Sequence, residues 1–112
     1  MEPLKIEFEE RDRVSILKLD GYLQGNDELS EKIDGLLEKE NCRIVLELSQ
    51  VHLINSAGLG ELVRLAAQAN SQGGRLVFAN PTPFVEGVLK TTRLDRFFEV
   101  HETLETALRT LA

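Results

Sequence analysis

One hydroxyl group stands out among the side chains that could do chemistry. Ser56 lies in residues 54–60, between an apolar segment and a segment with apolar residues at helical spacing. At such a junction the first backbone N–H groups of the helix are unpaired and the helix dipole is positive. A phosphate on Ser56 would find hydrogen-bond donors and a favourable field there. Serine is also a preferred N-cap residue, so we expect Ser56 to cap the helix, and one residue can fill both roles.

The other reactive side chains lack partners at useful spacings. His52 falls in an expected strand, His101 precedes the last expected helix, and Cys42 is the only cysteine. No acid or thiol stands at a metal-ligand spacing from either histidine, and no His or Lys is placed to act as a base for Ser56. We therefore expect no catalytic residue, no metal ligand and no cofactor. His52 is expected to be half-exposed in a strand, His101 solvated or part of a cap, and Cys42 buried.

The glycines beside Ser56 do not form a nucleotide-binding motif. Gly58-Leu59-Gly60 lacks the third glycine of a dinucleotide fingerprint, and the lysine and hydroxyl of a phosphate-binding loop are missing. The sequence therefore gives little support to a small enzyme or a nucleotide-binding protein.

Composition narrows the class of protein. The chain has 112 residues and a net charge of −6, from 13 basic and 19 acidic residues. This length predicts one domain over residues 1–112. The acidic balance disfavours binding to nucleic acid or to anionic lipid. Without a membrane-length apolar run or a secretory signal, and with a lone cysteine, the sequence predicts a cytoplasmic protein that is not inserted in a membrane.

Hydrophobic periodicity predicts alternating strands and helices. Strands are expected at residues 4–8, 14–19, 43–48, 75–79 and 97–100. Four helices are expected: one capped by Asn26 or Asp27, one from Leu59 that ends at Gly73-Gly74, one that begins at Pro81 and Pro83, and one capped by Thr103. This order predicts an α/β fold with a mixed, mainly parallel sheet and an antiparallel N-terminal edge.

Two loops are expected to share one end of this sheet. Residues 21–25 follow the second strand and Ser56 follows the third, and sites in such folds gather where parallel strands end. We expect a partner-binding surface there, although Tyr22 and Leu23 would fit ordinary loop packing equally well. The predicted contact residues are Tyr22, Leu23, Gln24, Asn55, Ser56, Ala57, Gly58, Leu59, Glu61 and Arg64.

Residues 46–60, Leu-Glu-Leu-Ser-Gln-Val-His-Leu-Ile-Asn-Ser-Ala-Gly-Leu-Gly, resemble the signature of STAS domains, and more narrowly that of bacterial anti-sigma factor antagonists. The family pattern is an apolar strand, a short loop and Asp-Ser-Ser/Thr-Gly-Leu-Gly. The resemblance extends over essentially the whole chain. It implies that Ser56 is phosphorylated by an anti-sigma factor that is also a serine kinase. It further implies that the unphosphorylated chain binds this factor and frees sigma for transcription. On the same resemblance, the phosphorylated chain does not bind productively, and a serine phosphatase returns it to the unphosphorylated form.

Three residues depart from the family pattern. Asn55 stands where the family often has Asp, Gln24 replaces the Asp of a Gly-x-Leu-Asp loop, and Ala57 replaces the second hydroxyl residue. The two amides would remove repulsion against a phosphate, or equally remove contacts that a kinase uses. They leave open a second function: a STAS scaffold without a phosphorylation switch, as a subunit of a lipid-transport or signalling assembly.

Overall fold

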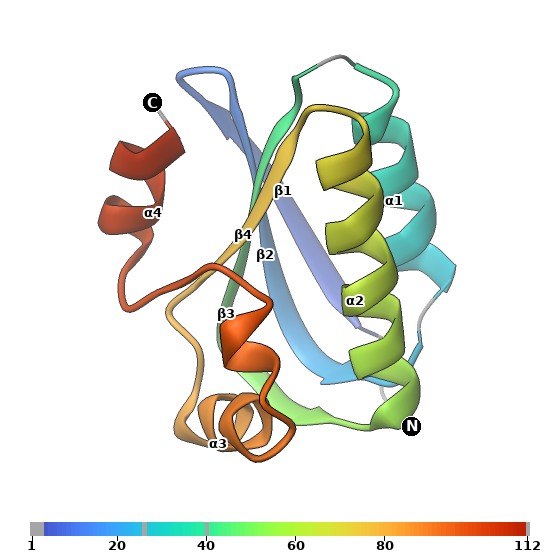
Figure 1. The fold of residues 1–112 in the computed structure, drawn as a ribbon, viewed down its shortest axis with the longest axis vertical. Helices are drawn as coiled ribbons and strands as arrows, with labels where there is room; N and C mark the ends of the chain where they lie inside the picture. Colours follow the sequence, from blue (N-terminus) through green and yellow to red (C-terminus); the bar gives the residue numbers. More distant parts are fainter. Residues whose placement is uncertain (1–3, 26, 40, 112) are drawn as a thin grey trace.

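The computed structural model describes residues 4–25, 27–39 and 41–111, so the predicted cap at Asn26 lies outside the described residues. The strands are β1 (Lys5–Arg11), β2 (Val14–Leu23), β3 (Arg43–Ile54), β4 (Arg75–Ala79) and β5 (Val100–His101). The helices are α1 (Asp27–Leu37), α2 (Ser56–Ser71), α3 (Pro83–Thr91), the 3₁₀ turn η1 (Leu94–Arg96) and α4 (Leu104–Leu111) (Figure 1). The predicted order of strands and helices is confirmed.

The strands form one sheet in the order β1-β2-β3-β4-β5. β1 pairs with β2 in antiparallel orientation, and every later pair is parallel. The carboxyl ends of the parallel strands therefore lie together along one border of the sheet, across the strand direction, and we call this border the carboxyl edge. The structure thus confirms the predicted α/β fold with an antiparallel N-terminal edge.

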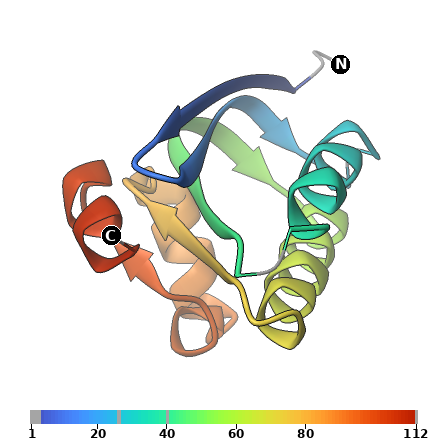
Figure 2. The ribbon, with the colours of Figure 1, turned by 90° about the horizontal axis from the view of Figure 1, so that it is seen from above.

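The sheet has an apolar core on each face, because alternate side chains of a strand point to opposite sides. Ile44, Leu46, Leu76 and Phe78 belong to the larger core, which also takes in buried residues of α1, α2 and α3. The intervening Val45, Val77 and Ala79 belong to the smaller core, which Ala107 and Leu111 of α4 complete. Figure 2 shows α4 on one side of the sheet and the pair α1 and α2 on the other.

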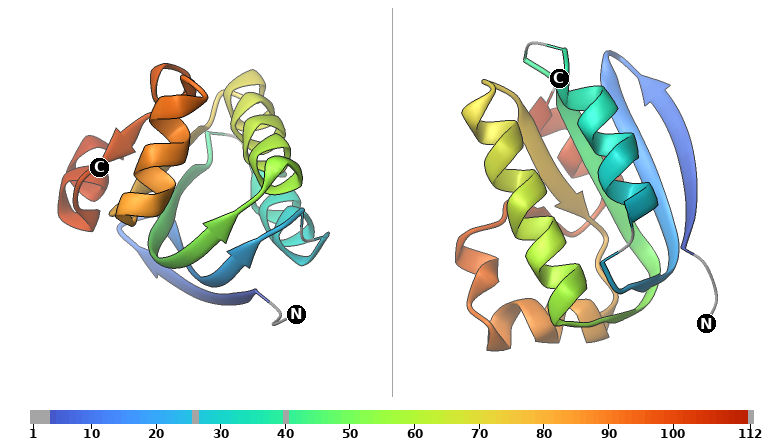
Figure 3. Two further views of the ribbon diagram at one scale, coloured as in Figure 1. Left: turned by 90° about the horizontal axis from the view of Figure 1, so that it is seen from below. Right: turned by 90° about the vertical axis from the view of Figure 1, so that its right-hand side faces the viewer.

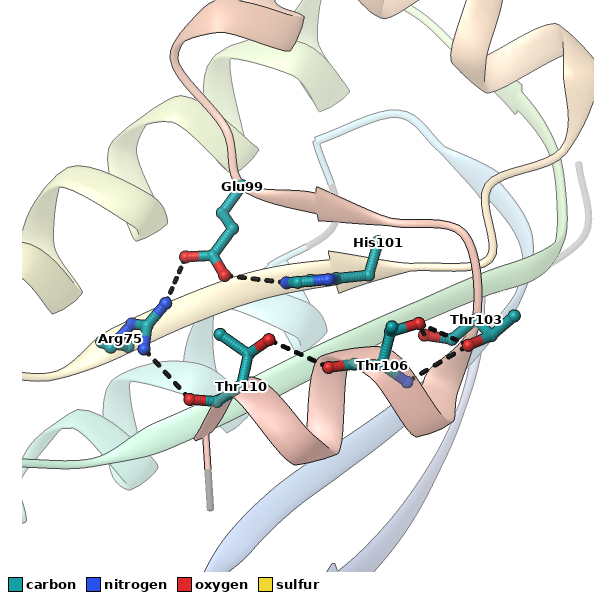
Figure 4. A network of polar contacts seen from close by, with 6 residues as sticks. All are labelled: Arg75, Glu99, His101, Thr103, Thr106 and Thr110. Carbon is teal, nitrogen blue, oxygen red and sulfur yellow. Dashed lines mark hydrogen bonds and ion pairs between the residues drawn. The ribbon is translucent and has the colours of Figure 1, made fainter.

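Two arginines hold the end of α4 against the sheet. Arg43, at the start of β3, donates to the backbone carbonyl of Leu111 at 2.6 Å. Arg75, at the start of β4, donates to the carbonyl of Thr110 at 3.4 Å and also pairs with Glu99 (Figure 4). At the other end of α4, the predicted Thr103 cap is confirmed, since its hydroxyl accepts from the amide of Thr106 at 3.1 Å.

Several strand boundaries differ from the prediction. β2 continues to Leu23 and β3 to Ile54, because the two strands stay paired through two irregularities, up to Leu23 opposite Ile54. The last strand begins at Val100 rather than at Phe97, because Phe97 and Phe98 donate their amides to the carbonyl of Leu94 and close the η1 turn. Across residues 4–25, 27–39 and 41–111, no helix combines the length and apolar character needed to cross a bilayer.

Candidate functional site

The helix after β3 is capped by Asn55 and not by Ser56. The Asn55 side-chain oxygen Oδ1 accepts a hydrogen bond from the amide of Gly58 at 2.9 Å, and its backbone is extended. Ser56 is the first residue of α2 and is exposed. Its hydroxyl makes no hydrogen bond to any residue that the structure describes. The expectation that Ser56 caps the helix is therefore wrong, because an amide one residue earlier already fills that role.

The loop after β2 and the start of α2 lie directly against each other. The amide of Asn55 donates to the carbonyl of Leu23 at 3.1 Å. A Cβ atom placed on Gly58 would stand 2.2 Å from that same carbonyl oxygen, and one on Gly25 would stand 3.0 Å from Cβ of Ala57. Glycine at position 58 thus permits a backbone approach that a side chain would block. The predicted adjacency of the two loops is confirmed.

The predicted contact residues differ in exposure. Asn55, Ser56, Ala57 and Arg64 are exposed, and Tyr22, Gln24 and Leu59 are partly exposed. Leu23 is fully buried because it packs in the larger core, and Gly58 is buried against it. Glu61 is only 9% exposed. Of the two interpretations of Leu23, packing is therefore the one that the structure bears out, whereas the prediction of Glu61 as an exposed contact residue is wrong. Neither side chain lies at the surface for a partner.

Glu61 instead joins α2 to α1. Its Oε2 accepts a hydrogen bond from the Ser30 hydroxyl at 2.5 Å. One turn further along α2, Nη1 of Arg64 lies 3.7 Å from Oδ1 of Asp34 on α1. Oε1 of Glu61 is buried without a hydrogen bond, so the Ser30 hydroxyl is the one group that the described residues offer to this carboxylate. These contacts fix α1 beside the helix that carries Ser56.

In the part of the chain that the structure describes, the remaining reactive side chains make no hydrogen bond or ion pair with Ser56. His52 is exposed on β3, and Cys42 is buried, which raises the pKa of its thiol. His101 lies on β5, and its Nε2 is 2.7 Å from Oε2 of Glu99, so the expectation of a solvated or capping residue is wrong (Figure 4). Burial pushes the pKa of Glu99 upward, but the hydrogen bonds and charges of His101 and Arg75 outweigh it and lower that pKa.

Two exposed apolar side chains at the carboxyl edge were not anticipated from the sequence. Leu53, near the end of β3, is 40% exposed, and Phe84, in the first turn of α3, is 50% exposed. In Figures 1 and 3 the last part of β3 runs between α3 and the first turn of α2. The proline pair before Phe84 marks a helix start, but a hydrophobic residue in a first turn gives no sign of whether it faces the core.

Comparison with known proteins supports this architecture. A protein from Thermotoga neapolitana, described as a candidate anti-sigma factor antagonist, is 37% identical over 67% of this chain, and the aligned part spans 66% of that relative's length. The anti-sigma F factor antagonist of Paenibacillus polymyxa is 27% identical over 96% of this chain and 95% of its own.

The same likeness extends to structure and to the family model. The crystal structure of a candidate anti-sigma factor antagonist from Thermotoga maritima superposes with a TM-score of 0.84 at 32% identity, and covers 95% of this chain and 93% of its own. The STAS domain model matches residues 5–107, which include all five strands and the junction at Ser56. The chain therefore belongs to the STAS domain family.

Proposed function

We propose that this chain is an anti-sigma factor antagonist controlled by phosphorylation of Ser56. In its unmodified form it binds an anti-sigma factor with serine kinase activity and so frees a sigma factor. The kinase phosphorylates Ser56 and weakens this binding, and a serine phosphatase reverses the modification. Such a partner acts on transcription, which places the chain in the bacterial cytoplasm. The chain serves as substrate and binding protein, and not as an enzyme.

The observation that carries this proposal is the state of the Ser56 hydroxyl. It is exposed, has no hydrogen-bond partner among the described residues, and stands on the first turn of a helix. Because Asn55 supplies the cap, a phosphate on Ser56 does not cost the helix its capping bond. The names of the Thermotoga and Paenibacillus relatives support the class of partner.

The physics of a phosphate at this place suits a switch at the surface. The group adds about −1.5 to −2 charges at neutral pH. In the free chain these charges face water and the positive end of the α2 dipole, so the fold tolerates them. Under a bound partner the same charges lose their hydration and need new donors, which weakens docking. The switch therefore requires no rearrangement of the sheet.

The amide at position 55 is compatible with this role. Asn55 offers the same capping oxygen that an aspartate would offer, but it carries no charge. A phosphate on Ser56 would therefore meet no like charge from its neighbour.

A capture experiment tests the proposal. The unmodified chain and its Ser56→Ala and Ser56→Asp variants are used as bait in a lysate of the source organism, and the captured proteins are identified. We expect the first two to retain an anti-sigma factor and Ser56→Asp to lose it. With ATP, the purified factor should phosphorylate the unmodified chain at Ser56, as seen by mass spectrometry. Equal capture by all three baits, with Ser56 unmodified, would instead indicate a scaffold without a switch.

A further inference from the structure

We propose that the contact with the anti-sigma factor extends from Ser56 across Leu53 to α3, and that the partner covers this area with an uncharged, apolar face. The inference rests on the proposed function and adds the position and chemistry of the main contact. We call this area the Leu53–Phe84 surface. It consists of Leu53 and the residues that line a shallow groove on α3, namely Pro83, Phe84, Gly87, Val88, Thr91 and Thr92.

The first support is exposure. Leu53 and Phe84 are two of the four large hydrophobic residues in the described part of the chain that are notably exposed, at 40% and 50%. Phe84 also lines the α3 groove, which has a volume of about 430 Å³. Apolar surface that a fold leaves uncovered, as in this groove, commonly marks an interaction site.

The second support is position. Leu53 stands two residues before the cap Asn55, on the same strand end. The first turn of α3 is fixed to that strand, since the Thr82 hydroxyl donates to the carbonyl of Val51 at 2.9 Å. This hydrogen bond holds the start of α3, and with it Phe84, beside β3, the strand that leads to Ser56. Figure 1 shows the last part of β3 passing from beside α3 to the start of α2.

The third support is size. A stable interface buries about 800 Å² on each partner, from some 20–30 residues. The exposed residues of the junction itself, Asn55, Ser56 and Ala57, are small and few, so a stable contact must extend beyond them. Along α2 the next exposed residues are Gly60, Arg64 and Ala67, which offer little apolar area. Binding energy concentrates in large, well-packed side chains, and Leu53 and Phe84 lie in the other direction.

The fourth support is charge, which selects the chemistry of the partner's face. None of the residues of the Leu53–Phe84 surface is charged, although the chain as a whole carries −6. On the same helix, Glu86 and Lys90 pair with each other at 3.3 Å, which leaves no net charge there. A basic partner face would find no counter-charge here, so we infer an apolar one. A phosphate at its border would then be costly to desolvate, which explains how one group can control the contact.

Binding measurements with matched variants test this inference. The probe is the anti-sigma factor identified by the capture experiment, purified as a single protein. We expect Phe84→Ser and Leu53→Ser each to weaken binding about tenfold or more. Phe8→Ser is the control, since Phe8 is 42% exposed but lies on β1 at the edge of the sheet, and it should leave the affinity unchanged. Thermal unfolding of each variant establishes that the fold persists.

A second readout does not depend on stability. A photoreactive phenylalanine analogue at position 84 should crosslink to the purified factor, and the same analogue at position 8 should not. Wild-type affinity in both serine variants, or no crosslink from position 84, would overturn the inference. If Ser56→Asp still abolishes binding in that case, the proposed function stands and only the Leu53–Phe84 surface fails. If no anti-sigma factor binds the unmodified chain, both fail together.

Discussion

The carbonyl oxygen of Leu23 meets the start of α2 twice: it accepts the amide of Asn55 at 3.1 Å, and it lies 2.2 Å from the place where a Cβ of Gly58 would stand. This one oxygen ties the end of β2 to the helix that presents Ser56. The position of the hydroxyl therefore depends on a glycine whose role is structural.

We expect Gly58→Ala to destabilise the fold by about 1–3 kcal/mol, since the new methyl group would force the backbone of Leu23 or of α2 to shift. Gly60→Ala is the matched control, because a Cβ there has no neighbour within 4 Å and lies inside a helix. It should stabilise the fold by roughly 0.5–1 kcal/mol. Denaturant unfolding measures both, and equal effects of the two changes would contradict the close approach at Gly58.

Asn55→Ala should lower the free energy of unfolding by about 1 kcal/mol, because the amide of Gly58 loses its acceptor. Asn55→Asp keeps an acceptor at the same place and should retain the stability of the unmodified chain. Ser56→Ala should change stability by less than about 0.5 kcal/mol, since Ser56 is exposed and does not cap α2. Thermal unfolding measures the relative stabilities of the three variants. A larger loss in Ser56→Ala than in Asn55→Ala would show that the cap is assigned to the wrong residue.

Ser30→Ala should cost about 1–3 kcal/mol, because it leaves the buried Glu61 carboxylate without its hydrogen-bond donor. Adding Glu61→Met to this variant removes the stranded carboxylate and should restore most of the loss. The unmodified chain, Ser30→Ala, Glu61→Met and the double variant form a double-mutant cycle that isolates the coupling between the two residues. Ser71→Ala, which removes an exposed hydroxyl of α2, serves as the control. Additive effects of the two changes would rule out the coupling.

Stability should fall in acid partly through Glu99. Its pKa is lowered in the folded chain, so its ionised form favours folding above the ordinary pKa of 4.5. This contribution is lost as the pH falls from 4.5 through the lower folded value. The effect should be modest, since the side chain is 38% exposed. Unfolding curves at neutral pH and at about pH 3 should therefore show a smaller acid loss for Glu99→Gln than for the unmodified chain. An identical acid loss in both proteins would contradict this role of Glu99.

The sequence was sufficient to predict the order of elements because apolar periodicity is strong in every core segment. The runs at Arg43 and Arg75 read as buried strands, and both are strands of the sheet. The ends of β2 and β3 were missed for a physical reason. Residues 49–53 mix polar and apolar side chains, and only their pairing with β2, through two register shifts, makes them a strand. Pairing between distant segments leaves no trace in local periodicity.

The sequence predicted the reactive residue of the candidate site better than it predicted which side chains around that residue are exposed. The motif indicated Ser56 and the loop beside it, and both lie together at the carboxyl edge. Whether Leu23 and Glu61 face inward depends on what α1 and β3 place against them, and one segment alone cannot show this. The exposure of Leu53 and Phe84 escaped prediction for the same reason, since an apolar side chain left uncovered looks like any other in the sequence.

The two faces of the sheet are covered unequally. The helices α1, α2 and α3 cover one face. Among the described residues, the other face is covered by the eight residues of α4, and Arg43 and Arg75 hold one end of this helix. A helix this short has little stability of its own, so its seat depends on these few contacts. Detachment of α4 should therefore be the least costly local opening of the molecule, and its backbone amides should exchange with deuterium well before those of β3. Each such event would briefly bare a strip of valine, isoleucine and alanine, and repeated exposure of this strip is the route by which we expect the protein to aggregate on prolonged warming.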